Sequence, residues 1–186
     1  MKRLAMISLL GLTAVNASAV EQWSPSPGEG SLTFTAEQQG APFEGLFREF
    51  TANFELDPDA MEGARIEATI VMDSVDTLYD ERDEYLRQAE WFDVERWPTA
   101  RFVTQSIQAT DDGYLADALL TLRDQTRSVA MAFKLEGLDD GRLRFTARSD
   151  VQRLDFGVGQ GQWTNTDWVG NDVTINVVLV LEPSLP

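Results

Sequence analysis

The feature that most constrains the fold is an alternation of apolar and polar residues with a period of two. Residues 65–72, 128–135, 143–148 and 173–181 each follow this pattern. Successive side chains of a β-strand point to opposite faces, so each segment predicts a strand with one buried face. About eight such strands, joined by short turns, predict an all-β antiparallel barrel or sandwich.

Turn residues and glycines favour the barrel over the sandwich. Residues 57–59 (Asp-Pro-Asp), 111–113 (Asp-Asp-Gly) and 139–141 (Asp-Asp-Gly) predict tight turns, and the last two bound predicted hairpins. Glycines within or beside the strands suit the sharp coiling of a closed barrel. These glycines are Gly40, Gly45, Gly157, Gly159 and Gly161.

Two segments depart from the simple alternation. The apolar positions are odd-numbered in residues 43–47 and even-numbered in residues 50–56, which predicts a bulge or bend near Arg48-Glu49. Residues 79–97 are crowded with charges, and their apolar residues recur at helical spacing. We therefore expect one short helix or helical lid there, ended by Pro98.

Carboxylates gather between Asp73 and Glu95, which raises the hypothesis of an acidic metal-dependent hydrolase. No glycine lies in this window, so the spacing of a helix-loop-helix calcium site is absent. Asp83 and Arg87 lie four residues apart, as in ordinary pairs on a helix surface. A solvated helix face is the favoured interpretation, and we assign no metal site.

Composition excludes several other classes of function. The chain has no cysteine and no histidine, which excludes thiolate nucleophiles, Ser-His-Asp catalysis and the usual zinc sites. Its 31 acidic residues outnumber 15 basic residues, for a net charge of −16. Such a chain is repelled by a phosphate backbone, so nucleic acid is excluded as a partner.

The amino terminus is typical of a secretory signal peptide. A basic start at Lys2-Arg3 precedes an apolar stretch, and Ala17-Ser18-Ala19 has the pattern of a cleavage site. We place the signal peptide at residues 1–19 and the folded domain at residues 20–186. The expected location is the periplasm, where a chain without cysteine folds independently of thiol chemistry.

Aromatic residues occur on most of the predicted strands and in the charged segment. Inside a small barrel such side chains either fill the lumen or line one apolar cavity for a ligand. The residue pattern alone leaves two alternatives open: a ligand-binding barrel, and a filled barrel that serves as an interaction module.

One stretch of motifs adds a resemblance to a known family. Residues 74–77 read S-V-D-T, residues 82–87 read R-D-E-Y-L-R, residues 91–93 read W-F-D and residues 98–102 read P-T-A-R-F. In order and spacing they closely resemble the YceI-like family, whose members run S-V-D-T, R-D-x-x-L-R, F-F-D and P-x-A-x-F. Weaker similarity extends the resemblance over essentially all of the chain after the signal peptide.

The resemblance implies an extended eight-stranded lipocalin-like antiparallel β-barrel with one short helical lid. Its apolar lumen is implied to hold a polyisoprenoid or similar long-chain lipid, such as a quinone, in an exported protein without enzymatic activity. We therefore expect a periplasmic binding or carrier protein whose ligand is this lipid and which needs no other cofactor. A membrane or a membrane protein would donate or accept the lipid, and a homodimer is compatible with this role.

The expected ligand-binding side chains lie on the inward rows of the strands and on the lid. They are Phe34, Gln38, Phe43, Phe47, Phe54, Ile70, Met72, Leu86, Trp91, Phe92, Phe102, Phe133 and Phe145. Gln38 stands where many family members have a histidine. Its amide can still form a hydrogen bond with a ligand headgroup at the barrel mouth.

Overall fold

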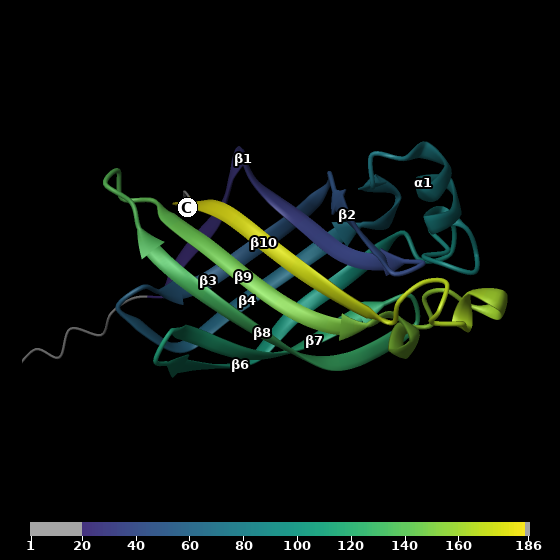
Figure 1. The fold of residues 1–186 in the computed structure, drawn as a ribbon. Helices are drawn as coiled ribbons and strands as arrows, with labels where there is room; N and C mark the ends of the chain where they lie inside the picture. The colour runs from purple at the N-terminus through teal and green to yellow at the C-terminus, as the bar shows by residue number, and fades with distance from the viewer. Residues whose placement is uncertain (1–19, 185–186) are drawn as a thin grey trace, which may run out of the picture.

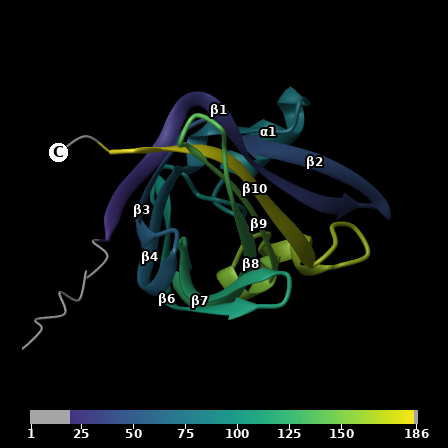
Figure 2. The same cartoon turned by 90° about the vertical axis from the view of Figure 1, so that its left-hand side faces the viewer.

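A computed structural model describes residues 20–184, in which ten strands form one sheet and eight of these close into an antiparallel barrel (Figure 1). Around the ring the order is β1-β10-β9-β8-β7-β6-β4-β3, and β3 pairs again with β1. The bounds are β1 (Glu21–Gln38), β3 (Phe50–Asp57), β4 (Ala60–Val71), β6 (Thr99–Thr110), β7 (Gly113–Leu122), β8 (Gln125–Gly137), β9 (Leu143–Gln152) and β10 (Asp172–Pro183). Viewed from one end, the strands surround a common centre (Figure 2). The predicted eight-stranded antiparallel barrel is confirmed.

Two further strands, β2 (Ala41–Phe47) and β5 (Val75–Asp76), extend the sheet from β1. The first residues of β1 pair with β3 and its last residues pair with β2, while its other edge pairs with β10 around an irregularity between Pro25 and Gly30. The predicted bend at Arg48-Glu49 is the connection between β2 and β3, which pair with opposite ends of β1.

Two chain segments cover the same end of the barrel (Figure 1). The first capping segment, residues 72–97, contains the 3₁₀ helix η1 (Met72–Ser74) and the α-helix α1 (Asp80–Arg87). The second capping segment, residues 153–171, contains η2 (Arg153–Phe156) and η3 (Gly161–Thr164). The predicted single short helix is confirmed as α1. The second capping segment was not predicted.

Three glycines that the sequence associated with strand coiling belong to the second capping segment. Gly157 and Gly159 lie between η2 and η3, and Gly161 is the first residue of η3. All three have a positive φ, which glycine adopts without steric cost. At the end of η2, the backbone N–H of Gly157 donates to the carbonyl groups of Arg153 and Leu154. These glycines therefore shape the cap, and the expectation that they bend the barrel wall was wrong.

Buried side chains form two clusters along the barrel. The closed-end cluster, away from the cap, includes Phe54, Phe133 and Phe145, and the Phe145 ring centroid lies 5.0 Å from Phe54 and 5.3 Å from Phe133. The cap-end cluster joins strand residues such as Phe34 to Trp91 and other cap residues. Dense aromatic packing at one end and chain segments over the other leave a space in the middle of the barrel.

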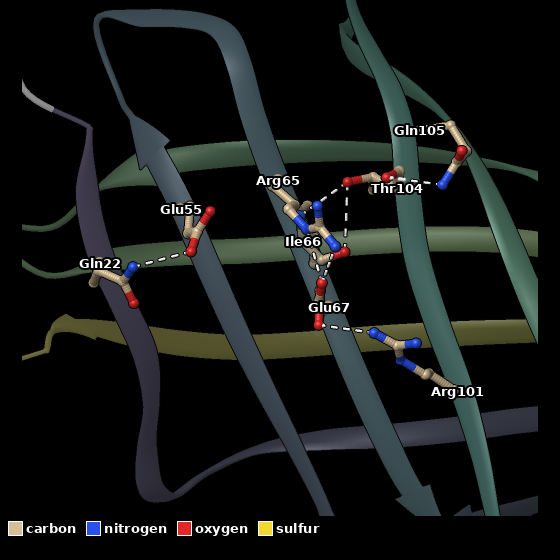
Figure 3. Close-up of polar contacts among 8 residues, drawn as sticks. All are labelled: Gln22, Glu55, Arg65, Ile66, Glu67, Arg101, Thr104 and Gln105. Atoms are coloured by element: carbon tan, nitrogen blue, oxygen red, sulfur yellow. Dashed lines mark hydrogen bonds and ion pairs between the residues drawn. The ribbon is translucent and has the colours of Figure 1, made fainter.

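Polar contacts join neighbouring strands of the barrel wall (Figure 3). Glu67 on β4 accepts hydrogen bonds from Arg65 and from Arg101, which lower the pKa of its carboxyl group. Where β4 and β6 separate, the Ile66 N–H donates to Thr104 Oγ1 at 2.9 Å. Exposed ion pairs contribute little to stability, so the fold rests mainly on the two buried clusters.

Residues 1–19, which the sequence assigns to a signal peptide, lie outside the described residues. β1 begins at Glu21, after the predicted cleavage position. In the described chain, residues 20–184, no helix has both the length and the apolar character needed to cross a membrane.

Candidate functional site

The barrel encloses an apolar cavity of about 200 Å³, the lumen cavity. Side chains from all eight barrel strands line its wall, because residues of one parity on each strand share the inner face. Trp91 and Phe156 of the two capping segments line it from the cap, and Phe54 and Phe145 line it from the closed-end cluster. The arrangement provides an apolar space inside the barrel that is suited to an apolar group.

Most of the side chains expected to bind a ligand surround this cavity. Those that line it are Phe34, Phe47, Phe54, Ile70, Met72, Leu86, Trp91, Phe92, Phe102 and Phe145. Gln38 and Phe43 lie in a different cavity at the cap. Phe133 is 3% exposed and does not line the lumen cavity, because it packs between Tyr114 and Phe145 in the closed-end cluster.

The cavity that contains Gln38 and Phe43, the mouth pocket, has a volume of about 190 Å³ and lies beside α1. Arg82 Cζ lies 4.0 Å from the centroid of the Phe43 ring, and Arg82 Nε donates to Gln38 Oε1 at 3.3 Å. The side chains that line both the mouth pocket and the lumen cavity are Leu86, Trp91 and Val169. They form the partition between this more polar pocket and the apolar lumen cavity.

Buried hydrogen bonds anchor the first capping segment. Asp83 is 6% exposed, and its Oδ1 accepts hydrogen bonds from the Thr77 N–H at 2.8 Å and from Thr77 Oγ1 at 2.6 Å. Arg87 donates to Asp73 Oδ1 at 2.8 Å and to the Val75 carbonyl at 3.0 Å. The polar residues of the S-V-D-T and R-D-x-x-L-R motifs therefore fix α1 beside β5.

The two capping segments meet along a seam. The backbone N–H groups of Gly159 and Gln160 both donate to the Glu90 carbonyl at 2.8 Å. The Trp163 ring packs beside Tyr85 and Trp91, with centroid separations of 5.9 and 5.5 Å. The two segments therefore form one continuous cap over the lumen cavity.

Arg153 holds the second capping segment together. It is 4% exposed, and its five N–H groups can donate to the carbonyl groups of Val158, Gly159, Trp163, Val169 and Gly170. None of the described carboxylates forms an ion pair with it. Burial lowers the pKa of this guanidinium. The Arg153 side chain thus holds residues 158–170 of the second capping segment around its guanidinium group, and we call this arrangement the Arg153 clamp.

The carboxylates between Asp73 and Glu95 are dispersed among separate partners. Asp73 binds Arg87, Asp76 pairs with Arg48, and Asp83 accepts hydrogen bonds from Thr77. The Leu78 N–H and the Arg48 guanidinium lower the pKa of the Asp76 carboxyl group. Over residues 20–184, no three acidic side chains are grouped in a way that could hold a metal ion.

Several lining residues were absent from the expected set. Val173, Ile175, Val177 and Leu179 on β10 line the lumen cavity. Their alternation was visible in the sequence and could have placed them there. Phe156, Val158 and Val169 also line it from the second capping segment, but no period marks them, because their positions depend on the Arg153 clamp.

A closed antiparallel barrel with an apolar lumen beneath a looped cap defines a lipocalin-like barrel, a class whose interior suits packed side chains or one small ligand. The chain belongs to the YceI-like domain family, which matches residues 23–181, and the resemblance found in the sequence is confirmed. Protein YceI of Salmonella arizonae is 32% identical over 119 residues, which cover 61% of this chain and 62% of that protein. Protein YceI of Salmonella newport has the same identity and coverage. The matched segment thus spans less than two thirds of these relatives.

Solved structures share the fold. BcnA of Burkholderia cenocepacia has a TM-score of 0.77 and 24% identity, covering 82% of this chain and 96% of its own. A polyisoprenoid binding domain from Saccharophagus degradans has a TM-score of 0.68 and 14% identity, covering 87% and 98%. The YceI protein of Campylobacter jejuni has a TM-score of 0.63 and 19% identity, covering 76% and 85%. At these identities the similarity establishes the barrel architecture.

The cap gives a testable expectation for local stability. Residues 79–97 are held by the seam and by a few buried hydrogen bonds, whereas the strands belong to a continuous ladder. We expect the backbone amides of residues 79–97 to exchange hydrogen faster than the strand amides in ligand-free protein, and to slow when a lipid is bound. Hydrogen exchange followed by mass spectrometry measures both rates. Rates equal to those of the strands, and unchanged by lipid, would contradict a mobile cap.

Proposed function

We propose that this protein binds one long-chain lipid of the polyisoprenoid class, with the apolar tail in the lumen cavity, and acts as a carrier or reservoir rather than an enzyme. The observation that carries the proposal is the lumen cavity with its nearly continuous apolar wall. Membership in the YceI-like family and the shared fold of a polyisoprenoid binding domain support it.

Burial of the tail supplies the affinity. Each CH₂ group moved out of water contributes about 0.8 kcal/mol, so even a partly buried tail offsets the cost of association. The cavity is larger than the roughly 150 Å³ apolar cavities that stay dry and accept benzene. A tail of many isoprene units needs more space, so its binding requires part of the cap or wall to move.

Charge favours a neutral headgroup. Removal of residues 1–19 takes away Lys2 and Arg3, which leaves 13 basic and 31 acidic residues and a net charge of −18. This field disfavours a prenyl phosphate and is compatible with a quinone or an alcohol. We further propose that the signal peptide directs the protein to the periplasm, where a membrane or membrane protein donates and accepts the lipid.

The lining residues have distinct proposed roles. The ten expected side chains around the lumen cavity contact the tail, and Gln38 and Phe43 guard the cap end. Phe133 supports the closed end by packing. Among the described residues, the ionisable side chains that line the lumen cavity are Arg148 and Arg153. Their guanidinium groups are engaged in hydrogen bonds, which supports binding rather than catalysis.

The decisive experiment is organic extraction of the purified protein followed by mass spectrometry. We expect about one lipid per chain in the wild type. Ala68→Phe, which fills the lumen cavity, is expected to lower the lipid content several-fold, whereas Thr69→Phe, on the outer face of the same strand, should retain it. Equal lipid content in both variants, or no lipid and no uptake of added lipid by the wild type, would contradict the proposal. Dialysis against a chelator should leave the melting temperature unchanged.

A further inference from the structure

The barrel wall separates between β8 and β9 near the cap, at a site called the fork. The ladder between these strands is short: it begins at the Ala132–Arg148 pair and ends at the Gly137–Leu143 pair. Beyond Arg148, β9 continues along β10, while the first half of β8 stays paired with β7. Within the described chain, the fork is spanned by one side-chain hydrogen bond, from Ser149 Oγ to the Ala130 carbonyl at 2.8 Å.

A cavity of about 590 Å³, the vestibule, lies outside the fork. It is bounded by residues 127–130 of β8, by Arg148 and residues 150–152 of β9, and by Asp155 and Phe156 of η2, with β10 at its far side. The side chains that line both the vestibule and the lumen cavity are Val129, Arg148, Val151 and Phe156. Phe156 is 2% exposed, and with Val129 and Val151 it forms the apolar part of the wall between the two spaces.

The polar part of the lumen wall gathers at the fork. Among the described side chains that line the lumen cavity, the polar ones are Thr33, Arg148, Ser149 and Arg153. Three of these four lie at or directly after the fork. Ser149 is buried at the fork, whereas the Arg148 side chain is largely exposed on the outer face, so polar groups occur on both sides of the barrel wall at this one place.

The separated strand edges add backbone groups to the vestibule. Strand residues direct their N–H and C=O groups alternately to the two neighbouring strands. The Ala130 carbonyl faces β9, so Ser128 and Ala130 direct their backbone groups into the fork. None of the described strands pairs with β8 there. A bound molecule would find both donors and acceptors on this edge.

The charges of the vestibule select the chemistry of that molecule. Arg148 donates to Asp150 Oδ1 at 2.9 Å and to Thr174 Oγ1 at 3.1 Å, so its charge is already compensated. Two arginines, Arg127 and Arg148, face three aspartates, Asp150, Asp155 and Asp172. This balance is slightly negative and favours an uncharged headgroup with hydrogen-bonding oxygens over a phosphate.

We propose that a lipid in the lumen cavity extends its neutral, oxygen-bearing headgroup sideways through the fork and that the vestibule holds this headgroup. The inference rests on the proposed lipid-binding function and adds the position and chemistry of the headgroup. A second separation, between β4 and β6, is bridged by Thr104, which accepts a hydrogen bond from the Ile66 N–H in the closed-end cluster. The mouth pocket, by comparison, is separated from the lumen cavity by Leu86, Trp91 and Val169.

Two alanines on the outer face of β8 allow a matched test. Ala130 lines the vestibule, whereas Ala132, two residues further along the same face, does not. The probe is a benzoquinone with a ten-carbon alkyl tail, and quenching of tryptophan fluorescence reports its binding. We expect Ala130→Phe to weaken binding by about tenfold or more, and Ala132→Phe to stay within about twofold of the wild type.

Equal affinity in the two variants overturns the inference while leaving lipid binding intact. A wild type that binds neither this probe nor an extractable lipid overturns the proposed function together with the inference. Thermal melts of both variants identify any loss of affinity that arises from unfolding. If Ala130→Phe does not fold, quenching of a bimane label, described next, tests the position of the headgroup.

The second measurement locates the headgroup directly. Because the chain contains no cysteine, Ser128→Cys in the vestibule and Gln38→Cys in the mouth pocket can each carry one bimane label. The quinone ring quenches a nearby label by contact. We expect stronger quenching at position 128 than at position 38, and the reverse order overturns the inference.

Discussion

Phe133→Ala is expected to lower the free energy of unfolding by about 3–5 kcal/mol, because the lost ring leaves a void that its neighbours cannot fill. Phe133 is buried in the closed-end cluster, with its ring centroid 5.1 Å from Tyr114 and 5.3 Å from Phe145. Since it does not line the lumen cavity, its removal should leave the affinity for lipid nearly unchanged. Urea denaturation measures the first quantity, and titration with lipid measures the second.

Phe102→Ala is the matched comparison. Phe102 lines the lumen cavity and is only partly buried, so one side of its ring already lacks packed neighbours. We expect its loss to cost clearly less stability than the loss of Phe133 and to change lipid affinity more. Similar destabilisation by both substitutions, with lipid and without it, would indicate that the barrel is a filled core.

Arg153→Met is expected to destabilise the protein by about 3–5 kcal/mol, because five carbonyl groups lose their donors in a buried loop. These carbonyl groups lie along the second capping segment, from Val158 to Gly170. Methionine has a similar length but no donor, so it isolates the loss of hydrogen bonding from the loss of volume. Chemical denaturation followed by circular dichroism measures the change.

Two further variants show whether the clamp geometry is responsible. Arg144→Met removes an exposed arginine of β9, outside the cap, and should change stability by less than about 0.5 kcal/mol. Arg153→Lys keeps the positive charge but lacks the planar guanidinium group with its five N–H donors. We therefore expect it to restore little of the stability that Arg153→Met loses. Wild-type stability in Arg153→Lys would show that charge alone holds the cap.

The inner wall of the barrel could be predicted because its signal is local. On β4, Ile66, Ala68 and Ile70 share a parity, and all three line the lumen cavity. Parity specifies the face of the sheet but not the depth along the barrel. Phe133 has the inward parity of its strand, yet it lies at the packed end, since its depth depends on how β7, β8 and β9 align.

The cap could be predicted only in part. The charges and helical spacing of residues 79–97 indicated α1, because these patterns are contained in one short segment. Phe156 reaches the lumen cavity through a loop whose shape depends on carbonyl groups converging on Arg153. The fork arises because β8 and β9 stop pairing with each other while each still pairs with its other neighbour. No residue pattern within a single strand indicates where this happens.

The pairing of β1 with β10 also determines the order in which the molecule can assemble. Trp23 lies opposite Pro183, so ring closure joins the beginning of the folded domain to its end. Contacts this distant in sequence carry a large loop-closure entropy and make folding slow. During synthesis, one edge of β1 stays unpaired until β10 has been made, and an unpaired strand edge is prone to aggregate. The lumen is thus among the last features of the molecule to form, and a lipid can be enclosed only by a complete chain.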